Sequence, residues 1–461
     1  MKYDLTVLGG GPGGYFAAIR AAQLGKKVCL IEKDKLGGVC LNWGCIPTKA
    51  LIKNAEVYSY IKNSEKYGIK VNNVSIDFKK NIKRSRDVSN RLSKGIEFLI
   101  QKNKIIHKIG RGELKSKSKV LIEADKKTEI IDSEYIVIAT GARPKSFSGL
   151  NLDFKRIISS KEAMLLESIP KKIIIIGSGA IGCEFSYYFN EFGSKIDLIE
   201  VKENILPVED SEISKELEKN FRQSGMSIHT KSKVLKIDSL KSEVLVHLEH
   251  NNKKEILKGD YALLAIGVNG NIEDIGLEKL GIEVENSAIK INEFNQTNIP
   301  NIYAIGDVSG PPWLAHVASA QGNVSVEHAF NYSTRPIDYL NIPGCTYSQP
   351  QVGSLGLTER EAIAKGHDIK IGKYSFKSNG KAMAVGHNQG FVKLIFDNRY
   401  GELLGAHIIG SEATELIAEL SLAKALETTW EDIAFGIHAH PTFSEAIMEA
   451  ALDAYGIGIH Q

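Results

Sequence analysis

The stretch DLTVLGGGPGG, residues 4–14, decides the first part of the fold. Residues 4–8 are a short apolar run with β-branched members, which predicts a buried strand. The residues that follow satisfy the pattern G-x-G-x-x-G through Gly9, Gly11 and Gly14. Glycines placed directly after a strand let the backbone approach a pyrophosphate.

The residues after these glycines complete a unit. Residues 15–24 predict a helix, and residues 28–32 (VCLIE) predict a second strand that ends in Glu32. The N-terminus of the helix favours a phosphate group, and the acid can bind a ribose hydroxyl. The sequence therefore predicts a Rossmann-like unit that binds a dinucleotide.

The same unit occurs a second time. Residues 172–176 (KIIII) predict a strand, residues 183–192 a helix, and residues 195–200 a strand that ends in Glu200. Between them stands the second fingerprint, Gly177, Gly179, Ala180, Ile181 and Gly182. Gly9 to Glu32 and Gly177 to Glu200 span the same interval of 23 positions.

Two complete copies predict two bound dinucleotides, because both copies keep all three glycines and the acid. The alternative is that one copy is a structural relic. Glu200 also favours NAD over NADP, since a carboxylate accepts a 2′-hydroxyl and repels a 2′-phosphate.

Between the copies lies GGVCLNWGCIPTK, residues 37–49, which contains Cys40 and Cys45. We expect residues 41–49 to open a helix, so that both thiols lie near its N-terminal end, where a reversible disulfide is possible. The helix N-terminus favours a thiolate. The stretch therefore predicts a redox dithiol.

Two other interpretations apply to this pair: a zinc half-site, or two buried small residues. Zinc sites usually have tighter cysteine spacing and a second ligand pair, which the sequence lacks, so we expect no metal. Cys29 lies inside a predicted strand, and Cys183 and Cys345 have no local partner, so we expect these three to be unreactive.

Composition sets outer limits. The chain has 461 residues, which indicates several domains, and 43% hydrophobic and 25% charged residues, which is ordinary for a globular protein. The formal charge of +3 does not suggest nucleic acid. No apolar run approaches the ~20 residues of a membrane span. A reactive thiol pair without a disulfide framework predicts a cytoplasmic location.

Other segments predict helices at about 48–67 and 77–103. Residues 301–307 (NIYAIGD) predict a strand that ends at Asp307. Asp307 can bind a polar cofactor group, or can cap a helix expected from about 314 to 332.

From about residue 345 onward the pattern changes. Residues 391–396 and 402–409 predict two strands joined by a hairpin turn at 397–401. Capping boxes are predicted at two helix starts, Thr358 with Glu361 and Thr429 with Asp432. This part predicts a separate α+β domain.

The motif HAHPTFSE, residues 438–445, lies near the end of the chain. Histidine is the natural base near neutral pH, and Glu445 can fix the tautomer of His440. The alternative is a buried histidine bonded to backbone, with Glu445 as an ordinary acid in the first turn of a helix. From the residues alone, the second interpretation is supported at least as well as the first.

Together the dithiol stretch, the two fingerprints, Gly306-Asp307 and the motif at 438–445 resemble the pyridine nucleotide–disulfide oxidoreductases over essentially the whole chain. Within that family the similarity is to enzymes that oxidise protein-bound dihydrolipoyl groups with NAD⁺, as the E3 component of 2-oxo acid dehydrogenase complexes. The resemblance implies FAD and NAD as cofactors. It also implies catalytic roles for Cys40, Cys45, His440 and Glu445, with His440 supplied by the other subunit of a homodimer.

The resemblance assigns the first fingerprint and Glu32 to FAD, with Lys49 near the flavin. The other residues that it places at the FAD site are Gly112, Thr140, Gly141, Asp307 and Ala315. It assigns the second fingerprint to NAD, together with Glu184, Glu200, Val234 and Gly267.

The predicted fold class is α/β, with two Rossmann-like dinucleotide-binding domains and a C-terminal α+β dimerisation domain. The expected boundaries are 1–148 for the FAD domain, 149–270 for the NAD domain, 271–343 for a return to the first domain, and 344–461 for the interface domain. The expected partners are the dihydrolipoyl domain of an acyltransferase (E2) or of a glycine cleavage carrier protein, and a second copy of the chain, with neither nucleic acid nor membrane.

Rival functions remain within and outside the family. One is another NAD(P)H-dependent disulfide reductase: Glu200 argues against the NADPH-dependent reductases, the absence of cysteines after Cys345 against mercuric reductases, and Cys40 against soluble transhydrogenases. The other is a non-catalytic, redox-sensing flavoprotein, against which the intact Cys40, Cys45 and His440 argue.

Overall fold

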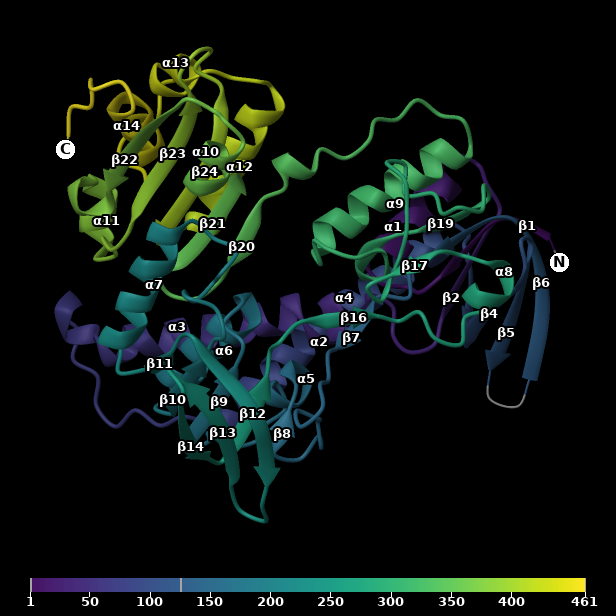
Figure 1. Cartoon of the computed structure of the whole chain (residues 1–461), viewed down its shortest axis with the longest axis horizontal. Coiled ribbons are helices and arrows are strands. Elements are labelled where there is room, and N and C mark those ends of the chain that lie inside the picture. The colour runs from purple at the N-terminus through teal and green to yellow at the C-terminus, as the bar shows by residue number, and fades with distance from the viewer. Residues whose placement is uncertain (1, 125–126, 461) are drawn as a thin grey trace.

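The computed structural model describes residues 2–124 and 127–460, which form three lobes around a common centre (Figure 1). Two lobes are built on largely or wholly parallel sheets, and the third on an antiparallel sheet. This is the mixed α/β architecture that the sequence predicts. No helix within the described ranges combines the length and the apolar character needed to cross a membrane.

The first sheet has seven strands in the order β3-β2-β1-β6-β5-β4, with β19 paired to β6. The strands are β1 (Lys2–Leu8), β2 (Val28–Glu32), β3 (Ile106–Ile109), β4 (Arg111–Ser116), β5 (Lys119–Ala124), β6 (Lys127–Ile138) and β19 (Ile302–Ala304). Helices α1 (Pro12–Gln23) and α9 (Ala315–Ala329) pack against each other beside it. Because β19 lies parallel to β6, the chain returns to its first sheet after completing the second unit.

The second sheet has five parallel strands in the order β11-β10-β9-β15-β8. They are β8 (Ile157–Ile158), β9 (Lys172–Ile176), β10 (Lys195–Ile199), β11 (Ser227–His229) and β15 (Tyr261–Leu264). Helices α5 (Ser160–Ala163), α6 (Ala180–Glu191) and α7 (Ser211–Gln223) belong to this lobe. A three-stranded antiparallel meander completes it, with β12 (Ser232–Ser239), β13 (Val244–His250) and β14 (Lys253–Gly259).

Short elements join these two lobes. Strand β7 (Ala142–Pro144) pairs with β16 (Val268–Gly270), so the chain leaving the first lobe lies beside the chain returning to it. The remaining short elements are η1 (Ser64–Tyr67), α8 (Leu277–Leu280), β17 (Val284–Glu285), β18 (Ala288–Ile289) and η2 (Gly306–Ser309).

The third lobe is an antiparallel sheet of order β20-β21-β24-β23-β22. Its strands are β20 (Gly344–Thr346), β21 (Gln351–Gly356), β22 (Ile369–Ser375), β23 (Phe391–Asp397) and β24 (Leu403–Gly410). Its helices are η3 (Tyr339–Asn341), α10 (Glu359–Ala364), η4 (Phe376–Ser378), α11 (Gly380–Val385), α12 (Ala413–Ala425), α13 (Trp430–Ala434) and α14 (Glu445–Asp453). The predicted β23–β24 hairpin and both predicted capping boxes are confirmed.

Each lobe has its own apolar core, because each sheet carries a run of branched side chains. Leu5 and Val7 of β1 are fully buried in the first lobe, as are Ile174 and Ile175 of β9 in the second. Cys29 and Cys183 are buried in these cores, and burial raises the pKa of the Cys29 thiol to about 12. Neither thiol is therefore placed to react, as the sequence predicted.

Helix boundaries near the dithiol differ from the prediction. A continuous helix through residues 41–49 is wrong: α2 (Gly38–Trp43) and α3 (Cys45–Lys62) are separate, and they meet at Gly44, whose φ and ψ are −145° and −114°. The expected helix at 48–67 therefore begins earlier and ends earlier. Helix α4 (Phe78–Lys102) is within a residue of its prediction.

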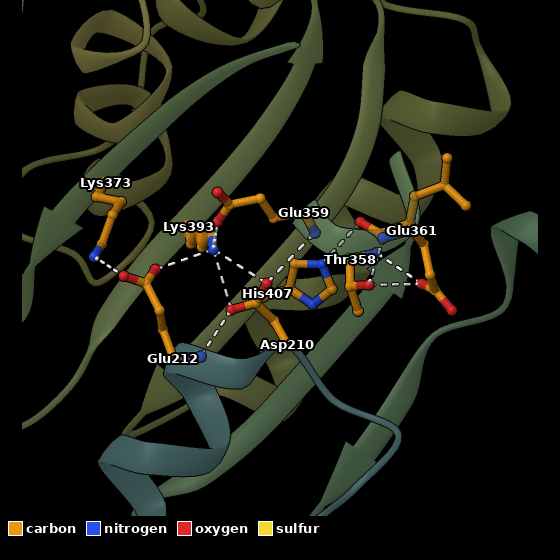
Figure 2. A network of polar contacts seen from close by, with 9 residues as sticks. Asp210, Glu212, Thr358, Glu359, Glu361, Lys373, Lys393 and His407 are labelled. Carbon is orange, nitrogen blue, oxygen red and sulfur yellow. Dashed lines mark hydrogen bonds and ion pairs between the residues drawn. The ribbon is translucent and has the colours of Figure 1, made fainter. Parts of the chain in front are cut away.

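A buried ion cluster joins the second and third lobes (Figure 2). Lys393 of β23 is fully buried, and its ammonium makes ion pairs with Asp210 (3.1 Å), Glu212 (3.0 Å) and Glu359 (2.6 Å). Asp210 also caps α7 by accepting a bond from the Glu212 backbone N–H at 3.0 Å. Burial works to lower the pKa of Lys393, but its hydrogen bonds to the two glutamates leave that pKa above its ordinary value.

Candidate active site

The two cysteines of the dithiol lie on either side of the α2–α3 break. Cys40 is the third residue of α2, and Cys45 is the first residue of α3; both are free thiols and partly exposed. A hydrogen bond between them raises the pKa of the Cys40 thiol and lowers the pKa of Cys45. The pair therefore favours ionisation of Cys45, with the Cys40 thiol as the hydrogen-bond donor.

Helix α2 is held in place by α4. The Asn42 amide donates to the carbonyls of Leu36 (3.1 Å) and Gly38 (3.0 Å), and Ser93 of α4 donates to Asn42 Oδ1 at 3.0 Å. Arg86 of α4 donates to Asn42 O at 2.6 Å. These bonds fix the ends of a very short helix that could not stand alone.

The first fingerprint forms an open cradle. A β-carbon on Gly9 would overlap the Ala139 carbonyl, and one on Gly14 would overlap the Gly9 carbonyl, so these two glycines are needed for backbone packing. Gly11 is different, because the nearest atom to its β-position is Gly38 Cα at 3.9 Å. It faces the space that a bound group can enter.

The second fingerprint repeats this arrangement. β-Carbons on Gly177 and Gly182 would overlap backbone carbonyls, whereas the β-position of Gly179 has no atom within 4 Å. The two acids also share one arrangement, since each accepts a hydrogen bond from a backbone N–H of its own fingerprint. Glu32 Oε2 accepts from Gly10 N at 2.7 Å, and Glu200 Oε2 accepts from Ser178 N at 3.0 Å.

The cradles fit two dinucleotides. Neither α1 nor α6 has a side-chain cap at its N-terminus, so the first N–H groups of each helix are available for a pyrophosphate. Asp307 lies in η2, and burial raises the pKa of its carboxyl group. In the part of the chain that the structure describes, this carboxyl has no hydrogen-bond partner, which fits a polar group of a bound cofactor. The alternative role for Asp307 is wrong, since Leu314 occupies the N-cap of α9.

Lys49 of α3 reaches across to the second lobe. Its ammonium binds both carboxylate oxygens of Glu184 in α6, at 2.8 and 3.0 Å. Glu184 is almost fully buried, and Lys49 is partly exposed. The ion pair therefore ties the dithiol helix to the nucleotide helix of the second unit.

The other residues expected at the first cofactor come from three separate parts of the chain. Gly112 is in β4, Ala315 is the first residue of α9, and Thr140 follows β6, where its hydroxyl donates to Asn271 O at 2.8 Å. Gly141 has φ of +70° and no atom within 4 Å of its β-position.

The remaining residues expected at the second cofactor come from several elements. Ala180 and Ile181 open α6, and Ile181 is exposed. Val234 is in β12. Gly267 has φ of +100°, and its β-position is open except for the Lys145 side chain at 3.7 Å.

His440 and Glu445 form a pair. His440 Nδ1 lies 2.8 Å from Glu445 Oε1, and Glu445 Oε2 accepts from Thr442 N at 2.8 Å. Burial works to raise the pKa of Glu445, but the Thr442 and His440 hydrogen bonds leave it below its ordinary value. His440 is 78% exposed, so the predicted alternative of a buried histidine is wrong.

One chain does not bring this pair to the dithiol. Helix α14, which begins at Glu445, lies in the upper left lobe, apart from α2 and α3 in Figure 1. The hydrogen bonds of His440 among the described residues do not include either cysteine. Within one chain, the imidazole and the dithiol therefore lie in different parts of the fold.

Three contributors were missed from the sequence: Arg86, Asn42 and Tyr347. The Tyr347 N–H donates to Glu184 Oε1 at 3.1 Å, and the Lys49 ammonium lies 4.3 Å from the centre of its ring. The contacts of Arg86 and Tyr347 join residues far apart in the chain, so no local motif signals them.

Comparisons with known proteins agree with this geometry. A family model described as "Pyridine nucleotide-disulphide oxidoreductase" matches residues 3–322, and a model of that family's dimerisation domain matches residues 342–451.

Curated relatives match over almost the full length. A dihydrolipoyl dehydrogenase from Zymomonas mobilis is 44% identical over 99% of both chains, and one from Bacillus subtilis is 42% identical over 100% of this chain and 99% of its own.

Solved structures share the fold. LpdA from Mycobacterium tuberculosis has a TM-score of 0.91 and 25% identity over 98% of this chain and 99% of its own. The HOCl-induced flavoprotein disulfide reductase RclA from Escherichia coli, as a Cu(II) complex, has a TM-score of 0.88 and 26% identity over the same shares.

Proposed function

The chain belongs to the pyridine nucleotide-disulphide oxidoreductases, and from that premise we propose that it acts as a dihydrolipoyl dehydrogenase. It oxidises protein-bound dihydrolipoyl groups to lipoyl groups, with FAD as cofactor and NAD⁺ as acceptor. The observation that carries the proposal is the Cys40–Cys45 pair between two nucleotide cradles, in which the hydrogen bond from Cys40 lowers the pKa of Cys45.

The substrate reacts with the enzyme by thiol–disulfide exchange. His440 of a second copy takes a proton from one dihydrolipoyl thiol, and Glu445 holds the imidazole and balances its charge. The resulting thiolate attacks Cys40 in the oxidised Cys40–Cys45 disulfide, which breaks that bond and leaves Cys45 as the thiolate. The second substrate thiol then displaces Cys40 and closes the cyclic lipoyl disulfide.

The reduced dithiol must next lose two electrons. FAD, when bound, supplies the carrier between the dithiol and NAD⁺. The chain contributes the residues that would hold it, Gly9, Gly11, Gly14, Glu32 and Asp307, and the Lys49 ammonium, which favours the Cys45 thiolate. For NAD⁺, the chain contributes Gly177, Gly179, Gly182 and Glu200.

The acceptor is NAD⁺ rather than NADP⁺. Both carboxylate oxygens of Glu200 are held by backbone N–H groups, from Ser178 at 3.0 Å and Lys202 at 2.9 Å. A carboxylate fixed beside the ribose position repels a 2′-phosphate.

The third lobe matches a dimerisation domain, which suggests a homodimer. We assign the dihydrolipoyl domain of an acyltransferase, or of a glycine cleavage carrier protein, as the protein substrate, because the curated relatives are dihydrolipoyl dehydrogenases. The cysteines at 29, 40, 45, 183 and 345 are all free, which supports a reducing, cytoplasmic setting.

The test is NADH formation from dihydrolipoamide by the purified protein. Cys45→Ser should retain bound FAD, read from its absorbance, and lose dithiol turnover. Cys183→Ser, in the core of the second lobe, is the matched control and should remain active. Full lipoamide activity in Cys45→Ser would overturn the assignment.

A further inference from the structure

The dithiol helix α3, the second lobe and the third lobe meet at one ammonium group. Lys49 comes from α3, Glu184 from α6 in the second lobe, and Tyr347 from the segment after β20 in the third. Helix α6 packs against both α3 and β20, so these contacts belong to a continuous junction. The Lys49 ammonium contacts both Glu184 and the ring of Tyr347.

Tyr347 makes two separate contacts at this junction. Its backbone N–H donates to Glu184 Oε1 at 3.1 Å, on the oxygen that also binds Lys49 at 2.8 Å. Its ring offers a face to the Lys49 ammonium at 4.3 Å. A cation over an aromatic face is attracted by the negative charge density of the ring, and more strongly where water is excluded.

The position of this ammonium matters for the dithiol. The hydrogen bond from Cys40 is the main cause of the lowered pKa of Cys45; the charge of Lys49 lowers it further, and Glu184 opposes this. Glu184 alone could draw the ammonium toward the second lobe, away from the sulfur. A ring face on a third side restricts that movement.

We propose that the ring of Tyr347 is a positioning element that holds the Lys49 ammonium between Cys45 and Glu184, and thereby couples the dimerisation lobe to the charge on the dithiol. The inference deepens the proposed function and rests on it. It assigns to the third lobe a role in tuning the dithiol of its own chain, beyond supplying His440 to another.

The ring face is separable from the rest of the side chain. Tyr347→Phe keeps the face and the backbone N–H, and loses only the hydroxyl that hydrogen-bonds Cys345. Tyr347→Leu keeps the N–H and loses the face. Tyr347→Met, an unbranched side chain, fills the space without a face and serves if the leucine variant does not fold.

The experiment uses the FAD-loaded enzyme, reduced anaerobically with dihydrolipoamide. The long-wavelength absorbance of a thiolate beside the flavin is followed against pH, because it reports the ionisation of Cys45. Several other titratable groups lie near this cluster: Cys40, Lys49, Glu184, Cys345, Glu415 and Tyr15. They are identical in all variants, so a difference between the variants reports the change at residue 347.

Tyr347→Phe should titrate like the wild type, and Tyr347→Leu and Tyr347→Met should titrate at a pH higher by about half a unit or more. An unchanged midpoint in both variants without a ring would overturn the proposal, even if their melting temperatures fall. A shift in Tyr347→Phe equal to that of the leucine variant would also overturn it. Failure of the wild type to develop the band would instead contradict the proposed function.

Discussion

At the scale of single residues, Glu445 is the group that sets the orientation of His440. We expect Glu445→Gln to lower kcat/KM for dihydrolipoamide roughly 10- to 100-fold, because a neutral amide cannot balance the charge of the imidazolium. Steady-state NADH formation measures this.

Helix α14 contains a matched control. Glu449 contacts His460 Nδ1 at 2.7 Å, in a pair of similar geometry. Glu449→Gln should leave dithiol turnover unchanged. Equal losses in the two variants would indicate a general effect on α14 rather than a role for the His440–Glu445 pair.

A second residue-scale prediction concerns His438. Its Nε2 lies 2.8 Å from Glu419 Oε1 and its Nδ1 lies 2.9 Å from Gly436 O, so both ring nitrogens face acceptors. The hydrogen bond to Glu419 raises the pKa of His438 above its ordinary value. The protonated ring therefore adds stability below about pH 6.5, and this contribution disappears as the pH rises through the raised pKa.

Glu419→Gln should remove that contribution. Urea unfolding from about pH 5.5 to about pH 9 should show the largest loss of stability on the acidic side and little loss at the alkaline end. Glu431→Gln, at an exposed position on α13, is the control. A loss independent of pH would contradict a protonated His438.

Residues with a local signature could be predicted from sequence. Cys40 with Cys45, and the fingerprint glycines, occur at fixed spacings because their chemistry involves neighbours in the chain. Tyr347 and Arg86 could not be found in this way, since each acts on a segment more than thirty residues away.

At the scale of elements, the break at Gly44 shows what periodicity misses. The residues on both sides favour a helix, and a single glycine in a helical pattern is often tolerated. Here a β-carbon at Gly44 would lie 3.1 Å from Val39 O, so the close approach of the two helices favours a glycine. The turn that separates the two thiols follows from packing that the local sequence does not encode.

The fingerprint of the second unit gives an element-scale prediction. Gly179→Ala should fold normally, because its β-position is empty and its φ of −66° suits alanine. The added methyl group would occupy the space expected for the pyrophosphate, so we expect the KM for NAD⁺ to rise about 10-fold or more.

Two other glycine substitutions serve as controls for this experiment. Gly95→Ala, in α4 with open space around it, should leave the KM for NAD⁺ unchanged. Gly182→Ala should unfold the second lobe, because its methyl group would overlap the Gly177 carbonyl. If Gly179→Ala folds and its KM for NAD⁺ is unchanged, then NAD⁺ does not bind beside Gly179.

At the scale of the whole molecule, Lys393 joins the second and third lobes. Lys393→Met would leave the Asp210 carboxylate, 3% exposed, without its counter-charge. We expect a loss of about 3–5 kcal/mol in the free energy of unfolding, measured in urea. Lys373→Met, which removes an exposed partner of Glu212, should cost less than about 1 kcal/mol. Similar losses of unfolding free energy in the two variants would show that the buried Lys393 ion pairs do not hold the two lobes together.

The origin of His440 can be tested by mixing chains. In a dimer of Cys45→Ser and His440→Asn chains, one site combines intact cysteines with the intact histidine of the other chain. If His440 acts across the interface, co-expression should restore about a quarter of wild-type dihydrolipoamide activity, because half of the dimers are mixed and each has one working site. No recovery in a purified mixed dimer would place His440 beside the cysteines of its own chain.

The order of the lobes could be predicted from the sequence, because the two nucleotide units repeat with the same spacing and the antiparallel lobe has strands joined by short turns. The contacts between the lobes could not be predicted from the sequence. The Lys393 cluster and the Lys49 junction unite positions whose distance in the chain is unrelated to their distance in space, and one sequence carries no record of such pairs.

The seam between Gly11 and Gly38 has a consequence for electron transfer. A β-carbon at Gly38 would lie 2.7 Å from Gly11 Cα, so the nucleotide cradle and the start of the dithiol helix rest main chain against main chain. No side chain acts as a spacer there. A side chain at Gly38 would therefore push these two segments apart, and would lengthen the path that electrons would take from the Cys40–Cys45 pair to a group bound in the cradle.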